Sequence, residues 1–193
     1  MTTSIIYGIY GASGCGRGVA PLVEEQLRDQ SNFEIVFIDD SDVGDKVNDL
    51  TILAYEEFLG LKIAEKRVTI AIANGAVRKR LATRCKSDGI DFFTARSSQH
   101  VAMKDVEVGE GAVFSPFTTL TSNIRIGSHF HCNIGSYVEH DCIIGDFVTF
   151  APGVKCNGNV HFSISSFIPC ASKNGVLSFV FSFSISCISS SSA

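Results

Sequence analysis

The residues best suited to catalysis are a histidine and an aspartate that are adjacent in the chain, His140 and Asp141. A histidine ring changes charge near neutral pH, so it is the usual general base for taking a proton from a nucleophile. A carboxylate beside it can orient the ring or raise its basicity. His140 stands two positions after Val138, which belongs to the apolar repeat described below, so its side chain should project from the surface. We therefore predict His140 as a catalytic base with Asp141 as its partner.

A glycine-rich segment, Gly-Ala-Ser-Gly-Cys-Gly at positions 11–16, joins an expected strand to an expected helix. Glycines let the backbone approach a phosphate, and a helix N-terminus offers oriented N–H groups with partial positive charge. Asp39 and Asp40 follow the second expected strand, where such folds place a residue that reads the ribose or base. This layout predicts a nucleotide site, with a dinucleotide as the default ligand. A glycine-rich turn without a ligand is the alternative.

Two further histidines, His129 and His131, could suggest a zinc site like that of β-helical carbonic anhydrases, which need three converging histidines. With three hexapeptides per coil, His131 should lie beside Thr149 and His140 beside Ser122, so no obvious trio converges. We therefore expect no metal.

The elements that must position these residues follow two patterns. Strands and helices alternate over residues 4–94, which predicts a parallel sheet with right-handed crossovers, a small Rossmann-like α/β domain. The expected elements are strands at 4–10, 33–38, 68–73 and 90–94 and helices at 16–30 and 76–86, with an irregular middle.

After about residue 100 the apolar residues recur with a period of six. Glycines at 109, 127 and 145 recur at every third hexapeptide and so mark a coil of three such units. This pattern predicts a parallel β-helix of hexapeptide repeats, whereas a β-sandwich would alternate with period two. A second lane of mostly small residues includes Cys142, which we expect to be a small buried hydrophobe, as are Cys132 and Cys156. The first lane contains Val108, Phe114, Leu120, Ile126, Cys132, Val138, Ile144, Phe150 and Cys156.

The composition excludes several classes of protein. A net charge of -4 argues against nucleic-acid binding, which needs a basic face. The 7 cysteines form no C-x-x-C pair, so a disulfide framework or zinc knuckle is not expected. The chain opens without a leader and lacks a long uncharged apolar stretch before residue 161, so we expect a cytoplasmic protein without membrane insertion.

Four segments resemble one family: IYGASGCGR, the pair Asp39-Asp40, IAIANGAVRKR and above all VEHDCIIGDFVTFAPGVKCNGNV. Over residues 4–160 the chain resembles the sugar O- and N-acetyltransferases of the sialic acid and bacillosamine pathways, whose β-helix is left-handed. The resemblance implies a UDP-linked amino sugar as the ligand of the first domain. The contacts implied for this ligand are Ser13, Gly14, Cys15, Asp39, Asp40 and the backbone near Ala73. Family members often carry His at position 15 and Gly at position 73.

The resemblance also implies a reaction, the transfer of an acetyl group from acetyl-CoA to the 4-amino group of a UDP-2-acetamido-4-amino-2,4,6-trideoxyhexose. His140 would be the general base, and the product would supply glycan or capsule synthesis. Where Thr149 stands, the family usually has a histidine that contacts the acetyl donor, and a threonine hydroxyl can still donate a hydrogen bond. Such enzymes are homotrimers with the donor groove between subunits.

These inferences give a domain plan. Residues 1–96 are expected to form the nucleotide-sugar-binding domain, 97–160 the β-helix acyltransferase domain, and 161–193 an aberrant tail rich in serine and phenylalanine. The tail is either a frameshifted terminus, a low-complexity extension or a poorly formed continuation of the β-helix. Two alternative functions stay open. One is a sialic acid O-acetyltransferase, and the other is an inactive nucleotide-sugar-binding protein, which the altered C-terminus and Thr149 would favour.

Overall fold

The computed structural model of the protein describes residues 4–162 and 167–169. Its first half is an α/β unit around a six-stranded sheet with the strand order β3-β4-β2-β1-β5-β6. Neighbouring strands run parallel apart from the antiparallel pair β3 and β4. The elements are β1 (Ile5–Tyr10), α1 (Gly14–Leu27), β2 (Phe33–Ile38), β3 (Lys46–Val47), β4 (Leu50–Leu53), α2 (Tyr55–Gly60), β5 (Glu65–Ile70), α3 (Gly75–Ser87) and β6 (Asp91–Phe92).

The sheet is covered on both faces because its central strand is apolar on both sides. Tyr7 and Ile9 of β1 pack with the apolar residues of α1. Ile6 and Tyr10, on the opposite face, pack with residues of α2 and α3. Alternating side chains of one strand therefore supply two separate cores.

The structure differs from the expected elements in four places. α1 begins two residues earlier and ends three residues earlier than the helix expected at 16–30, and β6 is shorter than the strand expected at 90–94. β5 runs from Glu65 to Ile70, whereas the apolar run predicted a strand at 68–73. The first three residues of β5 are charged, so the apolar run did not include them. They are half-buried because they lie at the solvent end of the strand. The middle expected to be irregular contains β3, β4 and α2.

The second half is a parallel β-helix, as the period of six predicted. Each strand pairs with the strand one coil further on, as in the register of Leu120 with Val138 and of Cys132 with Phe150. The strands are β7 (Ala95–Arg96), β8 (Val101–Val108), β9 (Val113–Phe114), β10 (Thr119–Ile126), β11 (His131–Cys132), β12 (Tyr137–Val138), β13 (Ile143–Ile144), β14 (Thr149–Phe150), β15 (Lys155–Cys156), β16 (His161–Phe162) and β17 (Phe167–Ile168).

The corners of the β-helix have a backbone repeat of their own. One residue in each six has a left-handed conformation, with φ between 55° and 71°. Glycine and asparagine adopt this conformation most readily, and they occupy five of these corners. The left-handed residues are Asp105, Gly111, Phe117, Asn123, His129, Gly135, Asp141, Phe147, Gly153 and Asn159.

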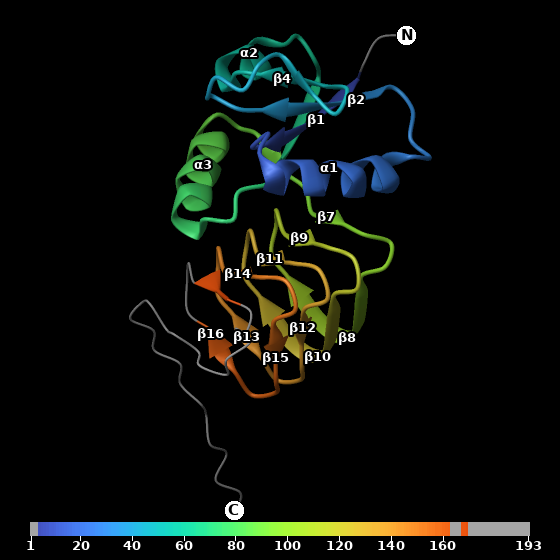
Figure 1. Ribbon diagram of the computed structural model, residues 1–193, viewed down its shortest axis with the longest axis vertical. Coiled ribbons are helices and arrows are strands. Elements are labelled where there is room, and N and C mark those ends of the chain that lie inside the picture. Colours follow the sequence, from blue (N-terminus) through green and yellow to red (C-terminus); the bar gives the residue numbers. More distant parts are fainter. Residues whose placement is uncertain (1–3, 163–166, 170–193) are drawn as a thin grey trace, which may run out of the picture.

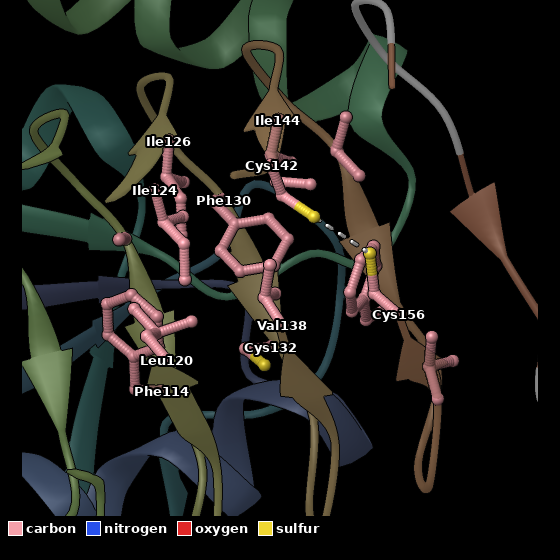
Figure 2. Packing of buried hydrophobic residues seen from close by; sticks show 14 of the residues in the cluster. Phe114, Leu120, Ile124, Ile126, Phe130, Cys132, Val138, Cys142, Ile144 and Cys156 are labelled. Atoms are coloured by element: carbon pink, nitrogen blue, oxygen red, sulfur yellow. Dashed lines mark hydrogen bonds between the residues drawn. The ribbon is translucent and has the colours of Figure 1, made fainter. Parts of the chain in front are cut away.

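The interior of the β-helix is filled by the two predicted lanes (Figure 2). Phe130 and Phe150 contact each other edge to face, with ring centroids 5.1 Å apart. Val108 departs from the prediction and is 39% exposed, because among the described strands β8 pairs only with β10. The cysteines at 132, 142 and 156 are buried as expected, and the sulfur atoms of Cys142 and Cys156 lie 3.9 Å apart.

The two units meet along α1, which lies over β7 and β9, and α3, which lies on the side of β14 (Figure 1). β7 at Ala95–Arg96 already pairs with β9, so strand pairing of the β-helix begins inside the range 1–96. At the other end, β16 and β17 pair with β13 and β14 and continue the β-helix beyond residue 160. The rest of the predicted tail, 163–166 and 170–193, lies outside the described residues. Among the described helices, none is long and apolar enough to cross a bilayer.

Candidate active site

His140 lies at an exposed corner between β12 and β13, and 52% of its side chain is exposed. Its Nδ1 atom lies 2.8 Å from Oδ2 of Asp141. The other carboxylate oxygen, Oδ1, accepts a hydrogen bond from Nδ2 of Asn123 on the preceding coil (3.2 Å). Because Nδ1 donates to the carboxylate, Nε2 is left as the basic nitrogen of the neutral ring.

The electrostatics of this pair suit a base. The hydrogen bond to Asp141 raises the pKa of His140 above its ordinary value, and the negative charge of the same carboxylate adds to the effect. In return, the hydrogen bonds from His140 and Asn123 lower the pKa of Asp141. The aspartate therefore stays ionised while the histidine exchanges its proton.

Two residues near His140 were not anticipated from the sequence, Gly158 and Asn123. A Cβ atom at Gly158 would lie 2.5 Å from Cε1 and 2.7 Å from Nε2 of His140, so the ring occupies the space above this glycine. Gly158 lies one coil after His140, and Asn123 lies one coil before Asp141. The spacing that defines the coil could therefore have identified both.

The glycine-rich loop is held in place by the second strand. Oδ2 of Asp39 accepts a hydrogen bond from the main-chain N–H of Ala12 (2.8 Å), and Oδ1 accepts from the main-chain N–H of Ser41 (3.1 Å). Ser13 is the N-cap residue of α1. A Cβ atom at Gly16 would lie 1.7 Å from the main-chain oxygen of Gly11, so only glycine fits this turn.

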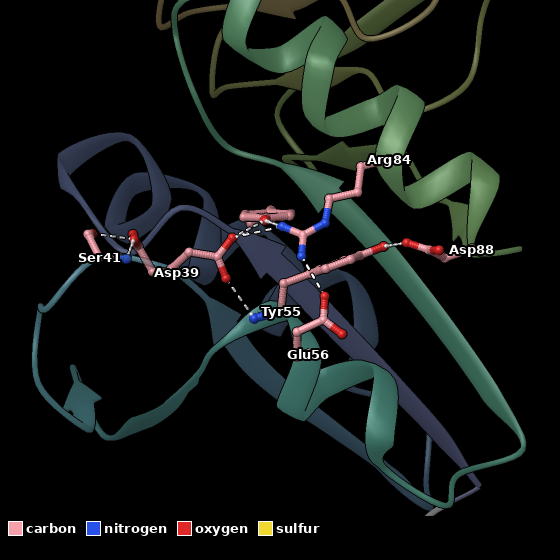
Figure 3. Close-up of polar contacts among 8 residues, drawn as sticks. Asp39, Ser41, Tyr55, Glu56, Arg84 and Asp88 are labelled. Atoms are coloured by element: carbon pink, nitrogen blue, oxygen red, sulfur yellow. Dashed lines mark hydrogen bonds and ion pairs between the residues drawn. The ribbon is translucent and has the colours of Figure 1, made fainter.

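Asp40 is occupied by contacts within the protein. Its Oδ2 accepts hydrogen bonds from the hydroxyl of Tyr10 (2.7 Å) and from Nη1 of Arg84 (3.0 Å), while Oδ1 accepts from the N–H of Tyr55 (2.9 Å). Arg84 also reaches Glu56 (2.7 Å), as Figure 3 shows. These contacts lower the pKa of the Asp40 carboxyl despite its partial burial. Asp39 and Asp40 line a shallow acidic hollow of about 340 Å³.

A separate cavity of about 240 Å³ lies between the two units. Four of the predicted ligand residues line it, Gly14, Cys15, Ala73 and Thr149. Burial raises the pKa of the Cys15 thiol, so this side chain is neutral. Thr149 is buried, and its hydroxyl donates to the main-chain oxygen of Ala73 (2.8 Å). The β-helix contributes the opposite wall, which includes Val113, His131 and Asn133.

The structure does not bring all the predicted residues together within one chain. His140 lies at the corner after β12, whereas the cavity is lined by residues at and next to β9, β11 and β14. Asp141 instead lines an open hollow of about 340 Å³ with Asp105, Arg125 and Ile143. The glycine-rich loop and the expected base therefore belong to two separate surfaces of the chain.

His129 and His131 are buried at the junction of the two units. Nε2 of His131 donates to the main-chain oxygen of Ile70 (2.9 Å). The ring of His129 stacks on Phe147, with centroids 5.1 Å apart, and burial lowers its pKa to about 4. Both rings are therefore neutral packing groups. Across residues 4–162 and 167–169, no cluster of three or more His, Cys, Asp or Glu side chains could hold a metal ion.

An α/β unit followed by a β-helix with an exposed histidine–aspartate corner defines the hexapeptide-repeat acyltransferases as the class. Residues 8–85 match the family model described as the PglD N-terminal domain. The chain is 40% identical over 165 residues to GDP-perosamine N-acetyltransferase of Escherichia coli O157:H7, covering 84% of this chain and 75% of the relative. The chain therefore belongs to the sugar N-acetyltransferase family and is an acyltransferase.

Two solved structures are similar. WeeI from Acinetobacter baumannii AYE is 48% identical with a TM-score of 0.81, covering 84% of this chain and 77% of WeeI. The acetyltransferase domain of PglB from Neisseria gonorrhoeae FA1090, in complex with acetyl coenzyme A, is 16% identical with a TM-score of 0.60. The match covers 88% of this chain and 94% of that domain. The second likeness supports the fold, an α/β unit in front of a β-helix.

Proposed function

We propose that the protein transfers the acetyl group of acetyl-CoA to the 4-amino group of a nucleotide-linked 4-amino-4,6-dideoxy sugar. The observation that carries this proposal is the exposed His140 ring, whose Nδ1 is held by Asp141 so that Nε2 is free to act as a base. The family supports the donor and the sugar class, since the PglB domain binds acetyl coenzyme A and the relative is named for GDP-perosamine.

In this mechanism the amine nitrogen attacks the thioester carbonyl while Nε2 of His140 accepts its proton. The carbon–sulfur bond then breaks, and the proton passes to the departing CoA sulfur. Asp141 stabilises the imidazolium that forms in between, because its carboxylate already holds Nδ1. Ser13, Gly14, Cys15, Asp39, Asp40 and Ala73 are proposed to hold the nucleotide sugar, and Thr149 to lie next to the donor.

Two candidates remain for the nucleoside diphosphate that the sugar carries. The sequence resemblance favours a UDP-linked 2-acetamido-4-amino-2,4,6-trideoxyhexose, whereas the 40% identical relative is named for a GDP sugar. We propose UDP as the first candidate and GDP as the second. The ratio of kcat/KM for the two nucleotide sugars decides between them.

We also propose a homotrimer in which one subunit's His140 completes a neighbour's site. The separation of His140 from the cavity within one chain supports this assembly. Exposed apolar side chains on the β-helix, Phe117 (64% exposed) and Ile134 (54% exposed), also favour contact with another subunit.

The test is CoA release from acetyl-CoA, measured with each nucleotide amino sugar for the wild type and for His140→Ala. Turnover that the variant loses supports the reaction and the base. Nucleotide-sugar binding without turnover in the wild type would instead support an inactive binding protein. Turnover with free sialic acid alone would support O-acetylation and overturn the proposed substrate.

A further inference from the structure

We propose that Arg78 of α3 is a positioning residue that fixes the nucleotide-binding unit against the β-helix at the geometry needed for acetyl transfer. Arg78 contacts both units, and the expected effect of its substitution on kcat rests on the proposed function. No feature of the sequence singles out this arginine from its neighbours Lys79 and Arg80.

Arg78 is fully buried, with 0% of its surface exposed. Its guanidinium donates hydrogen bonds only to main-chain oxygens among its described contacts. From the first unit, Ile72 (2.7 Å) and Ala73 (3.2 Å) accept from Nη1. From the β-helix, His129 (2.9 Å) accepts from Nε, and Phe147 (2.8 Å) and Val148 (3.2 Å) accept from Nη2. One side chain therefore ties both units together.

The main-chain oxygens that accept from Arg78 lie next to the cavity and at the corners of the β-helix. Ile72 and Ala73 follow the carboxyl end of β5, and Ala73 lines the cavity between the units. His129 and Phe147 are left-handed corners one coil apart, so Arg78 bridges two successive turns of the β-helix. The oxygen of Ala73 also accepts from the Thr149 hydroxyl. Arg78 therefore sets the distance between the two walls of the cavity.

The chemistry favours arginine specifically. A guanidinium presents five N–H donors in a planar fork, whereas a lysine ammonium presents three around one atom and cannot reach acceptors on both sides. A buried charge without a carboxylate partner costs free energy, which argues for a purpose other than stability. Although burial lowers the pKa of Arg78 to about 10, the side chain stays charged at neutral pH.

The experiment compares Arg78→Lys and Arg78→Gln with Arg80→Lys, a control on the exposed side of the same helix. The readouts are kcat, KM for each substrate, the Kd of the free nucleoside diphosphate, and amide hydrogen exchange over residues 70–76 and 129–149. All are measured below the melting temperature of the variants.

We expect Arg78→Lys to lower kcat by about ten-fold or more, since small misplacements of reactants are costly. Faster exchange in both segments should accompany this loss. The Kd of the free nucleoside diphosphate should rise by less than kcat falls, because Ala73 is the one proposed nucleotide contact that Arg78 bonds directly. Arg80→Lys should match the wild type. Unchanged kcat in Arg78→Lys, or a nucleotide Kd that rises as much as kcat falls, would overturn the proposal.

A second variant covers the case in which neither Arg78 variant folds. Thr149→Val keeps Arg78 and removes the other hydrogen bond to the Ala73 oxygen. Exchange is the readout for this variant, because Thr149 is itself proposed to lie next to the donor and a change in kcat could arise there. Exchange over residues 70–76 should become faster, and unchanged exchange would count against the proposal. If the wild type itself turns over neither nucleotide sugar, the proposed function fails, and the exchange data alone still decide whether Arg78 ties the units together.

Discussion

The side chains of His140 and Asp141 point toward each other although the two residues are neighbours in the chain, with Nδ1 and Oδ2 2.8 Å apart. Neighbours on an extended strand point to opposite faces. Asp141 instead occupies a left-handed corner of the β-helix, with φ of 57°, and the chain turns there. The repeat geometry of the coil thus produces the proposed base and its partner from adjacent residues.

The first prediction concerns removal of the base. His140→Asn should lower kcat by about 10²–10⁴-fold, the usual contribution of a positioned proton acceptor. The melting temperature should stay near that of the wild type, because the side chain is half exposed. Steady-state kinetics and thermal unfolding together check this, and a variant with wild-type kcat would rule out His140 as the base.

The second prediction is the pH dependence. The base acts when neutral, and Asp141 raises the pKa of His140, so activity should fall as pH drops through a value above the ordinary 6.5. Asp141→Asn removes the cause of the shift. Its acid limb should therefore move to lower pH, with a smaller maximal rate because the ring loses its orientation. A pH profile of kcat/KM measures both, and a limb that stays in place contradicts the assignment.

The third prediction tests whether the His140 ring must occupy the space above Gly158. A methyl group at Gly158 would lie 2.5 Å from the His140 ring, so Gly158→Ala should displace the ring and lower kcat with little loss of stability. Gly60→Ala is the matched control, since a Cβ there meets nothing within 4 Å. Equal kcat for the two variants would show that the ring is not needed where the structure places it.

The fourth prediction concerns the glycine-rich loop. Gly16→Ala places a Cβ 1.7 Å from the Gly11 oxygen, so it should open the turn, lower the free energy of unfolding and weaken nucleotide binding. Gly18→Ala, on the same helix, meets nothing within 4 Å and should raise stability by about 0.5–1 kcal/mol. Chemical denaturation compares the two, and a Gly16→Ala variant as stable as the wild type would contradict the close approach.

The sequence predicted the β-helix well because a period of six repeats a local rule many times. Phe114, Cys132 and Phe150 occupy equivalent interior positions in successive coils. Each therefore strengthens the prediction that the other two are buried. Cys142 was likewise predicted as buried packing from its lane alone.

Contacts between segments that are far apart in the chain could not be predicted from the sequence in this way. The place of Asp40 after β2 predicts a nucleotide-sugar contact, but it does not indicate that the carboxylate also accepts hydrogen bonds from Tyr10, Tyr55 and Arg84. Arg78 joins residues 51 to 70 positions away in the chain. No local pattern marks such a partner, because the partners become neighbours only when the two units pack together.

The left-handed corners restrict how the length of the β-helix can change during evolution. A deletion or duplication of three successive hexapeptides removes or adds one whole coil and leaves every later residue on its own face. A change of one or two codons would move Asp141 off its corner and send polar side chains inward. Natural variation in this half of the gene should therefore come in whole coils, and alleles that differ by a few codons should be rare.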